Sequence, residues 1–162
     1  YAEPAQYWAN LSAHLAFCYF LVAFAASPAR HVFSHSFAMT LLRNRRYVGL
    51  AFAVTHSFHL VALVYYFWVT DASPEMLSIV GGGFGYVLLY MMAITSSAKM
   101  VNTIGLGRWK ILHSTGMHYF ALIFLVTFAL RFIDERQSAV YGLYVVLLVL
   151  VYTVRILKFK RT

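Results

Sequence analysis

Acidic residues and cysteine are scarce in this sequence of 162 residues, which has 5 Asp and Glu against 13 Lys and Arg. Charged residues make up only 11% of the chain, whereas hydrophobic residues make up 62%. A soluble domain of this size carries roughly 25% charged residues, so the composition excludes a cytosolic globular enzyme. It also excludes a disordered chain, which requires low hydrophobicity. The one cysteine, Cys18, excludes an internal disulfide, a cysteine-rich zinc site and a cysteine-ligated iron–sulfur cluster.

Long apolar runs dominate the rest of the sequence. The hydrocarbon core of a bilayer is about 30 Å thick and needs about 20 mostly apolar residues of helix. Reading between the charged residues gives five such runs, at about residues 8–27, 47–69, 78–98, 111–132 and 139–157. Five segments of this length cannot be the strands of a closed barrel, so helix is the only suitable assignment. Short connections favour antiparallel neighbours. The sequence therefore predicts an all-α fold: an integral membrane up-and-down bundle of five transmembrane helices, forming one domain over residues 1–162.

The charges between these runs are sorted by sign. All five acids fall on one side of the expected membrane: Glu3, Asp71, Glu75, Asp134 and Glu135. Only two cations, Arg131 and Arg136, lie beside these acids. Eleven cations fall on the other side: Arg30, Arg43, Arg45, Arg46, Lys99, Arg108, Lys110, Arg155, Lys158, Lys160 and Arg161. Because cytoplasmic loops carry an excess of Lys and Arg, we expect the N-terminus outside and the C-terminus in the cytoplasm. The net charge of +8 thus reflects topology rather than binding to nucleic acid.

Histidine supplies most of the ionisable chemistry inside the expected spans. No Asp or Glu lies there, so the carboxylate typical of proton relays, ion pathways and transport sites is missing. Five histidines lie within the spans: His14, His56, His59, His113 and His118. His56 lies ten residues beyond Arg46, and His118 lies nine residues beyond Trp109. These spacings correspond to depths of about 15 Å and about 13–14 Å on two helices that run in the same direction.

Two imidazoles from neighbouring helices at one depth can ligate a b-type haem from both sides. The candidate axial ligands of the iron, not all of them at once, are His56, His59, His113 and His118. We expect His118 to pair with His56 or His59. His113 lies only about 6 Å from the inner interface, where it would ligate an inner haem or support another ligand. For His14 alone, a hydrogen bond between helices is the better interpretation.

Several residues at the ends of the expected spans are candidates for contacts at the membrane surface. Four cations at the inner ends of the histidine-bearing spans are candidates for contacts with haem propionates or with an acidic electron donor: Arg45, Arg46, Arg108 and Lys110. Topology alone also accounts for these charges. Trp109 is expected to be an interfacial anchor. Arg131 and Arg155 lie near span ends, from which long side chains reach the interface.

The segments around these histidines also resemble a known family. The resemblance rests on residues 45–52 (RRYVGLAF) followed by His59, on residues 109–113 (WKILH), and on the proline-containing helix end at residues 27–30 (SPAR). These motifs are similar to those of the ferric-reductase-like transmembrane domain superfamily. That superfamily includes the haem-binding membrane subunit of the bacterial periplasmic methionine-sulfoxide reductase system and the membrane parts of NADPH oxidases and ferric reductases. The resemblance implies that transmembrane histidines hold b haems that pass electrons across the membrane.

The sequence departs from this family pattern at several points. Members commonly have another histidine about thirteen residues after the one that matches His113, where this chain has Val126. The departure favours one haem, with a second left open, and gives His118 the role of the deeper ligand. Members usually have six spans, so one would precede Tyr1 or be absent. The oxidases and reductases also continue into a cytoplasmic flavin- and NADPH-binding domain.

We therefore expect a membrane b-type cytochrome that contains haem b, and the resemblance implies a bacterial inner membrane as its location. It would relay electrons across or within the membrane, from a quinol or flavoprotein donor to an acceptor or partner subunit, with catalysis in a separate chain. The alternative is a structural or assembly subunit of a larger membrane complex, whose histidines only form hydrogen bonds between helices. Copper handling ranks lower, because the nearby thioethers follow no ligand spacing: Met91, Met92, Met100 and Met117.

Overall fold

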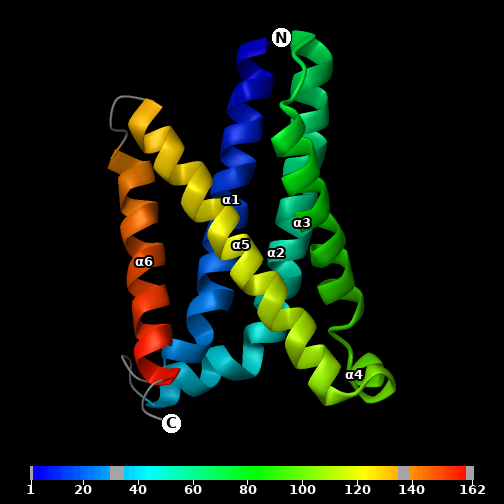
Figure 1. The fold of residues 1–162 in the computed structure, drawn as a ribbon, viewed down its shortest axis with the longest axis vertical. Coiled ribbons are helices and arrows are strands. Elements are labelled where there is room, and N and C mark those ends of the chain that lie inside the picture. The colour runs from blue at the N-terminus through cyan, green and yellow to red at the C-terminus, as the bar shows by residue number, and fades with distance from the viewer. Residues whose placement is uncertain (1, 30–34, 135–138, 160–162) are drawn as a thin grey trace. The chain divides into compact units, whose positions relative to one another are not determined.

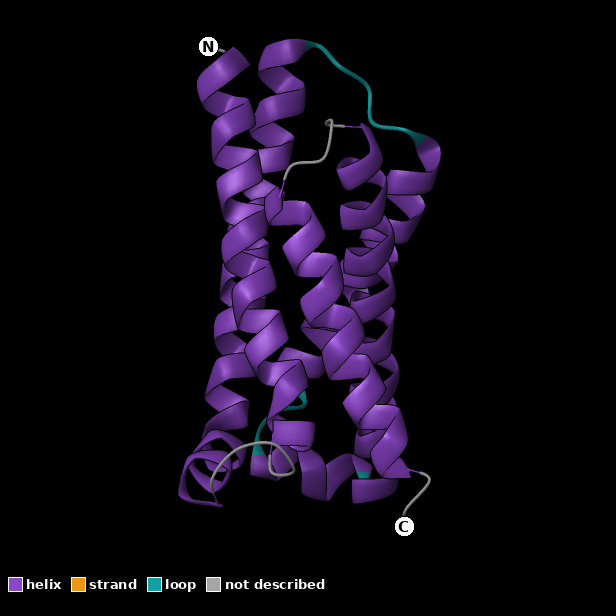
Figure 2. Ribbon diagram, turned by 90° about the vertical axis from the view of Figure 1, so that its left-hand side faces the viewer, coloured by secondary structure: helices purple, strands orange, loops and turns teal. Residues whose placement is uncertain are grey.

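Helices form every regular element in the described part of the chain, which comprises residues 2–29, 35–134 and 139–159 of this computed structural model (Figure 1, Figure 2). In chain order they are α1 (Ala2–Ala29), α2 (His35–Thr70), α3 (Met76–Ile94), α4 (Ala98–Ile104), α5 (Leu106–Asp134) and α6 (Ala139–Phe159). The all-α prediction is confirmed for these residues. Some of the charged residues used to predict the orientation lie outside the described ranges: Arg30, Glu135, Arg136, Lys160 and Arg161.

Four of the described helices are long and apolar enough to cross a membrane. They are α1, the Ser36–Thr70 part of α2, α5, and the Ala139–Leu157 part of α6. A fifth crossing is reached only if α3 and α4 together form one bent span. The described chain therefore has four or five helices suited to a lipid bilayer. The direction of insertion stays a prediction.

The third expected span, residues 78–98, differs from the structure at its C-terminal end. There α3 ends and α4 begins, and the two helices are bent by 105° (Figure 1). The break coincides with three successive hydroxyl residues. Thr95 Oγ1 donates to a carbonyl one turn back in α3 at 2.7 Å, and Ser97 caps the N-terminus of α4. Such side chains compete with the helical backbone pattern and favour caps, which explains the interruption.

Both α1 and α2 extend beyond the spans predicted from the sequence. The expected first span begins near residue 8, whereas α1 begins at Ala2. The expected second span begins near residue 47, whereas α2 begins at His35. Span prediction counts apolar residues, but a helix continues through polar residues of good helix propensity such as Arg45 and Arg46.

The chain forms two compact units. Unit 1 comprises the described residues within 1–23 and 46–116, and unit 2 those within 24–45 and 117–162. Helices α1, α2 and α5 each contribute to both units. The single domain over residues 1–162 stays a prediction.

In unit 1, aromatic residues pack α1 against α2. The buried rings of Phe20 and Phe52 lie 5.5 Å apart between centroids. The rings of Trp8 and Tyr65 lie 5.9 Å apart, so the start of α1 lies beside the end of α2. The hydroxyls of Ser57 and Tyr90 lie 3.1 Å apart and link α2 to the antiparallel α3.

Charge is separated along unit 1. Its described acids lie near the start of α1 and around the connection from α2 to α3: Glu3, Asp71 and Glu75. Its described cations lie where the unit's part of α2 begins, in α4 and in the first turns of α5: Arg46, Lys99, Arg108 and Lys110. Clustering of Lys and Arg at one end is the pattern from which the positive-inside rule predicts the cytoplasmic side of a membrane protein.

In unit 2, stacked aromatic rings join α5 to α6. Phe124 and Phe128 stack along α5 at 5.7 Å, and Phe128 stacks on Tyr141 of α6 at 5.8 Å. Arg131 Nη1 donates to the Tyr141 hydroxyl at 3.2 Å. Phe24, from the C-terminal part of α1, is fully buried in this unit.

Candidate functional site

His59 links α2 to α1 through one nitrogen of its ring. Its Nδ1 atom lies 3.1 Å from the carbonyl oxygen of Ala9 and 3.1 Å from Ser12 Oγ. A carbonyl oxygen only accepts hydrogen bonds, so Nδ1 carries the proton and donates it. The lone pair then lies on Nε2. His59 is therefore held in the tautomer whose Nε2 can coordinate a metal.

Ser12 completes this link between α1 and α2. Its hydroxyl donates to the Ala9 carbonyl at 2.9 Å, so its oxygen is available to accept from His59 Nδ1. The Ser12 side chain is only 6% exposed, and hydrogen bonds are stronger in such a buried environment, because the local dielectric is low. Ser12 was not among the residues selected from the sequence. The available signal was a hydroxyl within an apolar span that also carries a histidine.

His56 lies one turn before His59 and packs among aromatic rings. It stacks on Tyr86 of α3, with 4.9 Å between centroids and 24° between planes. The Tyr86 hydroxyl also donates to the His56 backbone carbonyl at 3.1 Å. Phe52 lies 5.3 Å from the His56 ring, and His59 lies 5.5 Å from it. The two histidine rings are neighbours, as their three-residue spacing predicts, but His56 contacts α3 whereas His59 contacts α1.

His113 joins the start of α5 to the end of α3. Its Nε2 lies 3.2 Å from Thr95 Oγ1. Because that hydroxyl donates its proton to the Met91 carbonyl at 2.7 Å, it accepts from His113 Nε2. The His113 ring also packs on Trp109 at 4.3 Å, and Trp109 Nε1 donates to the Thr95 carbonyl at 3.1 Å. The Nε2 atom of His113 is thus engaged with protein as a donor.

His118 belongs to unit 2. Its ring meets Phe24 of α1 at 5.9 Å and 86°, and Tyr152 of α6 at 5.7 Å and 88°. Two rings therefore hold the imidazole edge-on from different helices. His14 is half-buried on α1 in unit 1, and its Nδ1 atom is buried. The pairing of His118 with His56 or His59 stays a prediction.

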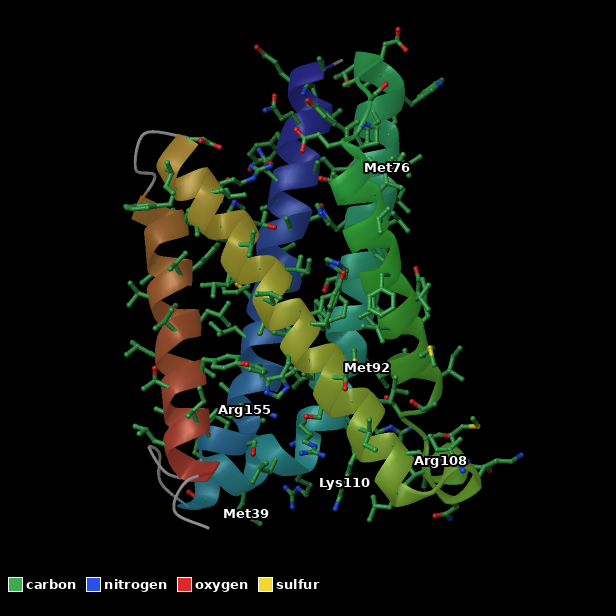
Figure 3. All side chains as sticks on the ribbon, in the orientation of Figure 1. Met39, Met76, Met92, Arg108, Lys110 and Arg155 are labelled. Atoms are coloured by element: carbon green, nitrogen blue, oxygen red, sulfur yellow. The ribbon has the colours of Figure 1, made fainter. Side chains whose placement is uncertain are left out.

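The cations selected from the sequence are exposed. Arg108 and Lys110 project from the first turns of α5 (Figure 3). Arg46 in unit 1 and Arg45 in unit 2 are likewise exposed. Exposed charges are suited to meeting a partner that approaches from the membrane surface. Contacts with haem propionates stay a prediction.

Hydroxyl groups contact the histidines, and none of them was among the residues selected from the sequence. Tyr86 and Thr95, like Ser12, lie in apolar segments, and each contacts a histidine from another helix. Across the described ranges, no group of three or more His, Cys, Asp or Glu side chains comes together to hold a metal ion. A b-type haem differs from such a centre, because the protein supplies only axial ligands.

No model of a known protein family, no curated protein and no solved structure matches this chain. The resemblance to the ferric-reductase-like transmembrane domain superfamily stays a hypothesis that rests on the motif residues alone.

Proposed function

We propose that this chain is a membrane b-type cytochrome that relays electrons. The observation that carries the proposal is the bond from His59 Nδ1 to the Ala9 carbonyl. Metal-ligating histidines almost always donate their second ring N–H to a carbonyl, carboxylate or water, which fixes the tautomer and raises ligand basicity. His59 has this arrangement within an apolar helix.

The chemistry of the available donors also fits haem b. The predicted spans contain neutral imidazoles and no carboxylate, and imidazole is a usual axial ligand of haem iron. His59 is the first choice in unit 1, because its Nδ1 carries the proton and its Nε2 the lone pair, whereas His113 donates through Nε2. His118 is proposed as the second ligand from the sequence register. His113 is then a residue that supports the fold near the site, and His56 is the alternative ligand on α2.

Each residue near His59 has a defined task in this proposal. A bound haem supplies one-electron iron chemistry. The Ala9 carbonyl and Ser12 orient the His59 imidazole, while Phe52 and Tyr86 shield the adjacent His56 ring from water. The exposed cations at the basic end of unit 1 attract an acidic flavoprotein donor, or lie where a quinol would approach. The acceptor is a partner subunit or an oxidant on the opposite side of a bacterial inner membrane.

A spectrum of the purified chain tests the proposal. We expect haem-replete protein in detergent to show a Soret band and a reduced-minus-oxidised difference spectrum, with one haem per polypeptide by pyridine haemochrome assay. His59→Ala and His118→Ala should lose this haem, whereas the matched controls His113→Ala and His14→Ala should keep it. A chain that is purified from cells supplied with haem and shows no Soret band would refute the proposal. Full haem content in both His59→Ala and His118→Ala would refute the assigned ligands.

A structural or assembly subunit is the second candidate function. It is favoured by the same hydrogen bonds, because His59 joins α1 to α2 and His113 joins α3 to α5. Hydrogen bonds between helices stabilise membrane bundles without any cofactor. Under this function, His59→Ala would lower the melting temperature of the purified chain by the same amount whether the chain comes from cells supplied with haem or from cells depleted of haem. Under the cytochrome function, haem stabilises only the parent chain, so the two conditions differ.

A further inference from the structure

Pro28 removes one helical hydrogen bond from α1. In an α-helix the carbonyl of residue n accepts from the N–H of residue n+4. Proline has no N–H, so the carbonyl of Phe24 does not receive its helical donor. In lipid such a carbonyl must find another partner, because no water is present to satisfy it.

Arg155 of α6 supplies that donor within unit 2. Its Nη1 atom donates to the Phe24 carbonyl oxygen at 3.2 Å. The two residues are 131 positions apart in the sequence. Arg155 is half-buried and lies near the end of α6 (Figure 3). Instead of only extending to the membrane interface, the guanidinium satisfies a backbone group that Pro28 leaves open.

The same guanidinium also fixes the Phe24 side chain. The Arg155 Cζ atom lies over the Phe24 ring, 4.7 Å from its centroid, which is a cation–π contact. Phe24 is 0% exposed and presents its ring to His118 at 86°. Tyr152, almost one turn before Arg155 on α6, meets both the Phe24 ring and the His118 ring. His118 is thus enclosed by two rings, and Arg155 anchors one of them.

We propose that Arg155 is a positioning residue for His118. Its bond to the Phe24 carbonyl and its contact with the Phe24 ring hold that ring in place, and the ring sets the orientation of the His118 imidazole. The role in the cytochrome rests on the proposed function, in which His118 ligates the iron. The pairing of Arg155 with the carbonyl freed by Pro28 is independent of haem.

A double-mutant cycle on the full chain tests the pairing. Pro28→Ala restores an N–H at position 28 and returns the helical donor to the Phe24 carbonyl, so Arg155 becomes less necessary. In thermal unfolding of the purified chain in detergent, we expect Arg155→Met to lower the melting temperature with Pro28 present, and to lower it much less together with Pro28→Ala. Arg131→Met is the matched control, because Arg131 bonds to Tyr141 and should show additive effects with Pro28→Ala. Additive effects of Arg155→Met and Pro28→Ala would overturn the proposal.

A second readout follows the His118 ring directly. In ¹⁵N-histidine NMR, the His118 signals are assigned by their loss in His118→Gln. Arg155→Met should shift these signals and leave those of His113 in place, whereas Arg155→Lys should produce a smaller shift. Unmoved His118 signals in Arg155→Met would overturn the positioning role. If Arg155→Met does not fold, rescue of its folding by Pro28→Ala supports the pairing. If Pro28→Ala does not rescue folding, the double-mutant cycle is repeated with Arg155→Lys in place of Arg155→Met, and additive effects there overturn the proposal.

The outcomes separate this inference from the proposed function. A chain that binds no haem but shows the coupling and the His118 shift retains the positioning role and refutes the cytochrome. A chain that binds haem but shows additive effects retains the cytochrome and refutes the role of Arg155. In haem-loaded protein that passes both tests, Arg155→Met should also change the midpoint reduction potential.

Discussion

Replacing Thr95 with valine removes the hydroxyl on which the end of α3 and the start of α5 meet, while it preserves the branched shape of the side chain. That hydroxyl accepts from His113 Nε2 at 3.2 Å and donates to the Met91 carbonyl at 2.7 Å. The bond from Trp109 Nε1 goes to the Thr95 backbone carbonyl and survives the substitution. Thr95→Val therefore tests the bond to His113 with little change to the remaining contacts.

The magnitude follows from the atoms that lose a partner. The Met91 carbonyl still accepts from the Thr95 backbone N–H at 3.1 Å, so losing the hydroxyl donor at this carbonyl costs little stability. His113 Nε2 loses the Thr95 acceptor, and the His113 ring is half-buried. Hydrogen bonds between membrane helices average about 0.6 kcal/mol and reach about 1.7 kcal/mol. We expect Thr95→Val to lower the free energy of unfolding by an amount in this range.

Equilibrium unfolding in mixed detergent and SDS micelles measures the effect. Thr95→Val, His113→Ala and the double variant form a cycle, and the expected coupling energy is about 0.6–1.7 kcal/mol. Thr103→Val is the matched control, because the exposed Thr103 hydroxyl bonds only within α4, and it should change stability little. A coupling energy near zero would refute the assignment of His113 Nε2 as a structural donor and would make Nε2 available for iron.

Two further predictions concern packing. Gly142→Ala would place a Cβ atom 2.8 Å from the exposed Phe132 ring, which must shift, so the substitution should not bring the gain of roughly 0.5–1 kcal/mol that Ala gives over Gly in a helix. The Cβ atom added by Gly49→Ala meets nothing within 4 Å, so this substitution should raise the stability of the chain by up to about 1 kcal/mol. Thermal unfolding compares the two variants, and a higher stability of Gly142→Ala than of Gly49→Ala would contradict the packing of α6 on α5. Tyr86→Phe keeps the stacking on His56 but loses the hydroxyl bond to its carbonyl, so we expect a loss of about 1 kcal/mol of stability with unchanged haem content. A large fall in haem content would contradict the choice of His59 over His56 as ligand.

The sequence alone was sufficient for the helical class and for most of the apolar spans. A long apolar segment in lipid must satisfy its backbone internally, so its secondary structure follows from composition and length. The adjacency of His56 and His59 was equally accessible, because it depends on the helical period. The interruption at Thr95 was harder to predict, because three hydroxyl residues barely alter the apolar character of residues 78–98.

The partners of the polar groups were beyond the sequence. Trp109 has the pattern of an interfacial anchor, yet its indole also donates to the Thr95 carbonyl. Nothing local indicates that His59 commits Nδ1 to α1 whereas His113 commits Nε2 to α3. These choices depend on which helix faces meet and at what height, which is a property of long-range packing.

Composition and charge order by themselves determined that this protein is helical, suited to a membrane, and rich in histidine where other ionisable groups are scarce. Only the tertiary structure decided which imidazole nitrogen is engaged with protein, and that Arg155 serves a carbonyl on a helix 131 residues away in sequence. The physical reason is that the preference of an apolar helix for lipid depends only on the residues of that helix. A hydrogen bond to a side chain, by contrast, requires two atoms from different helices to meet within about 3 Å.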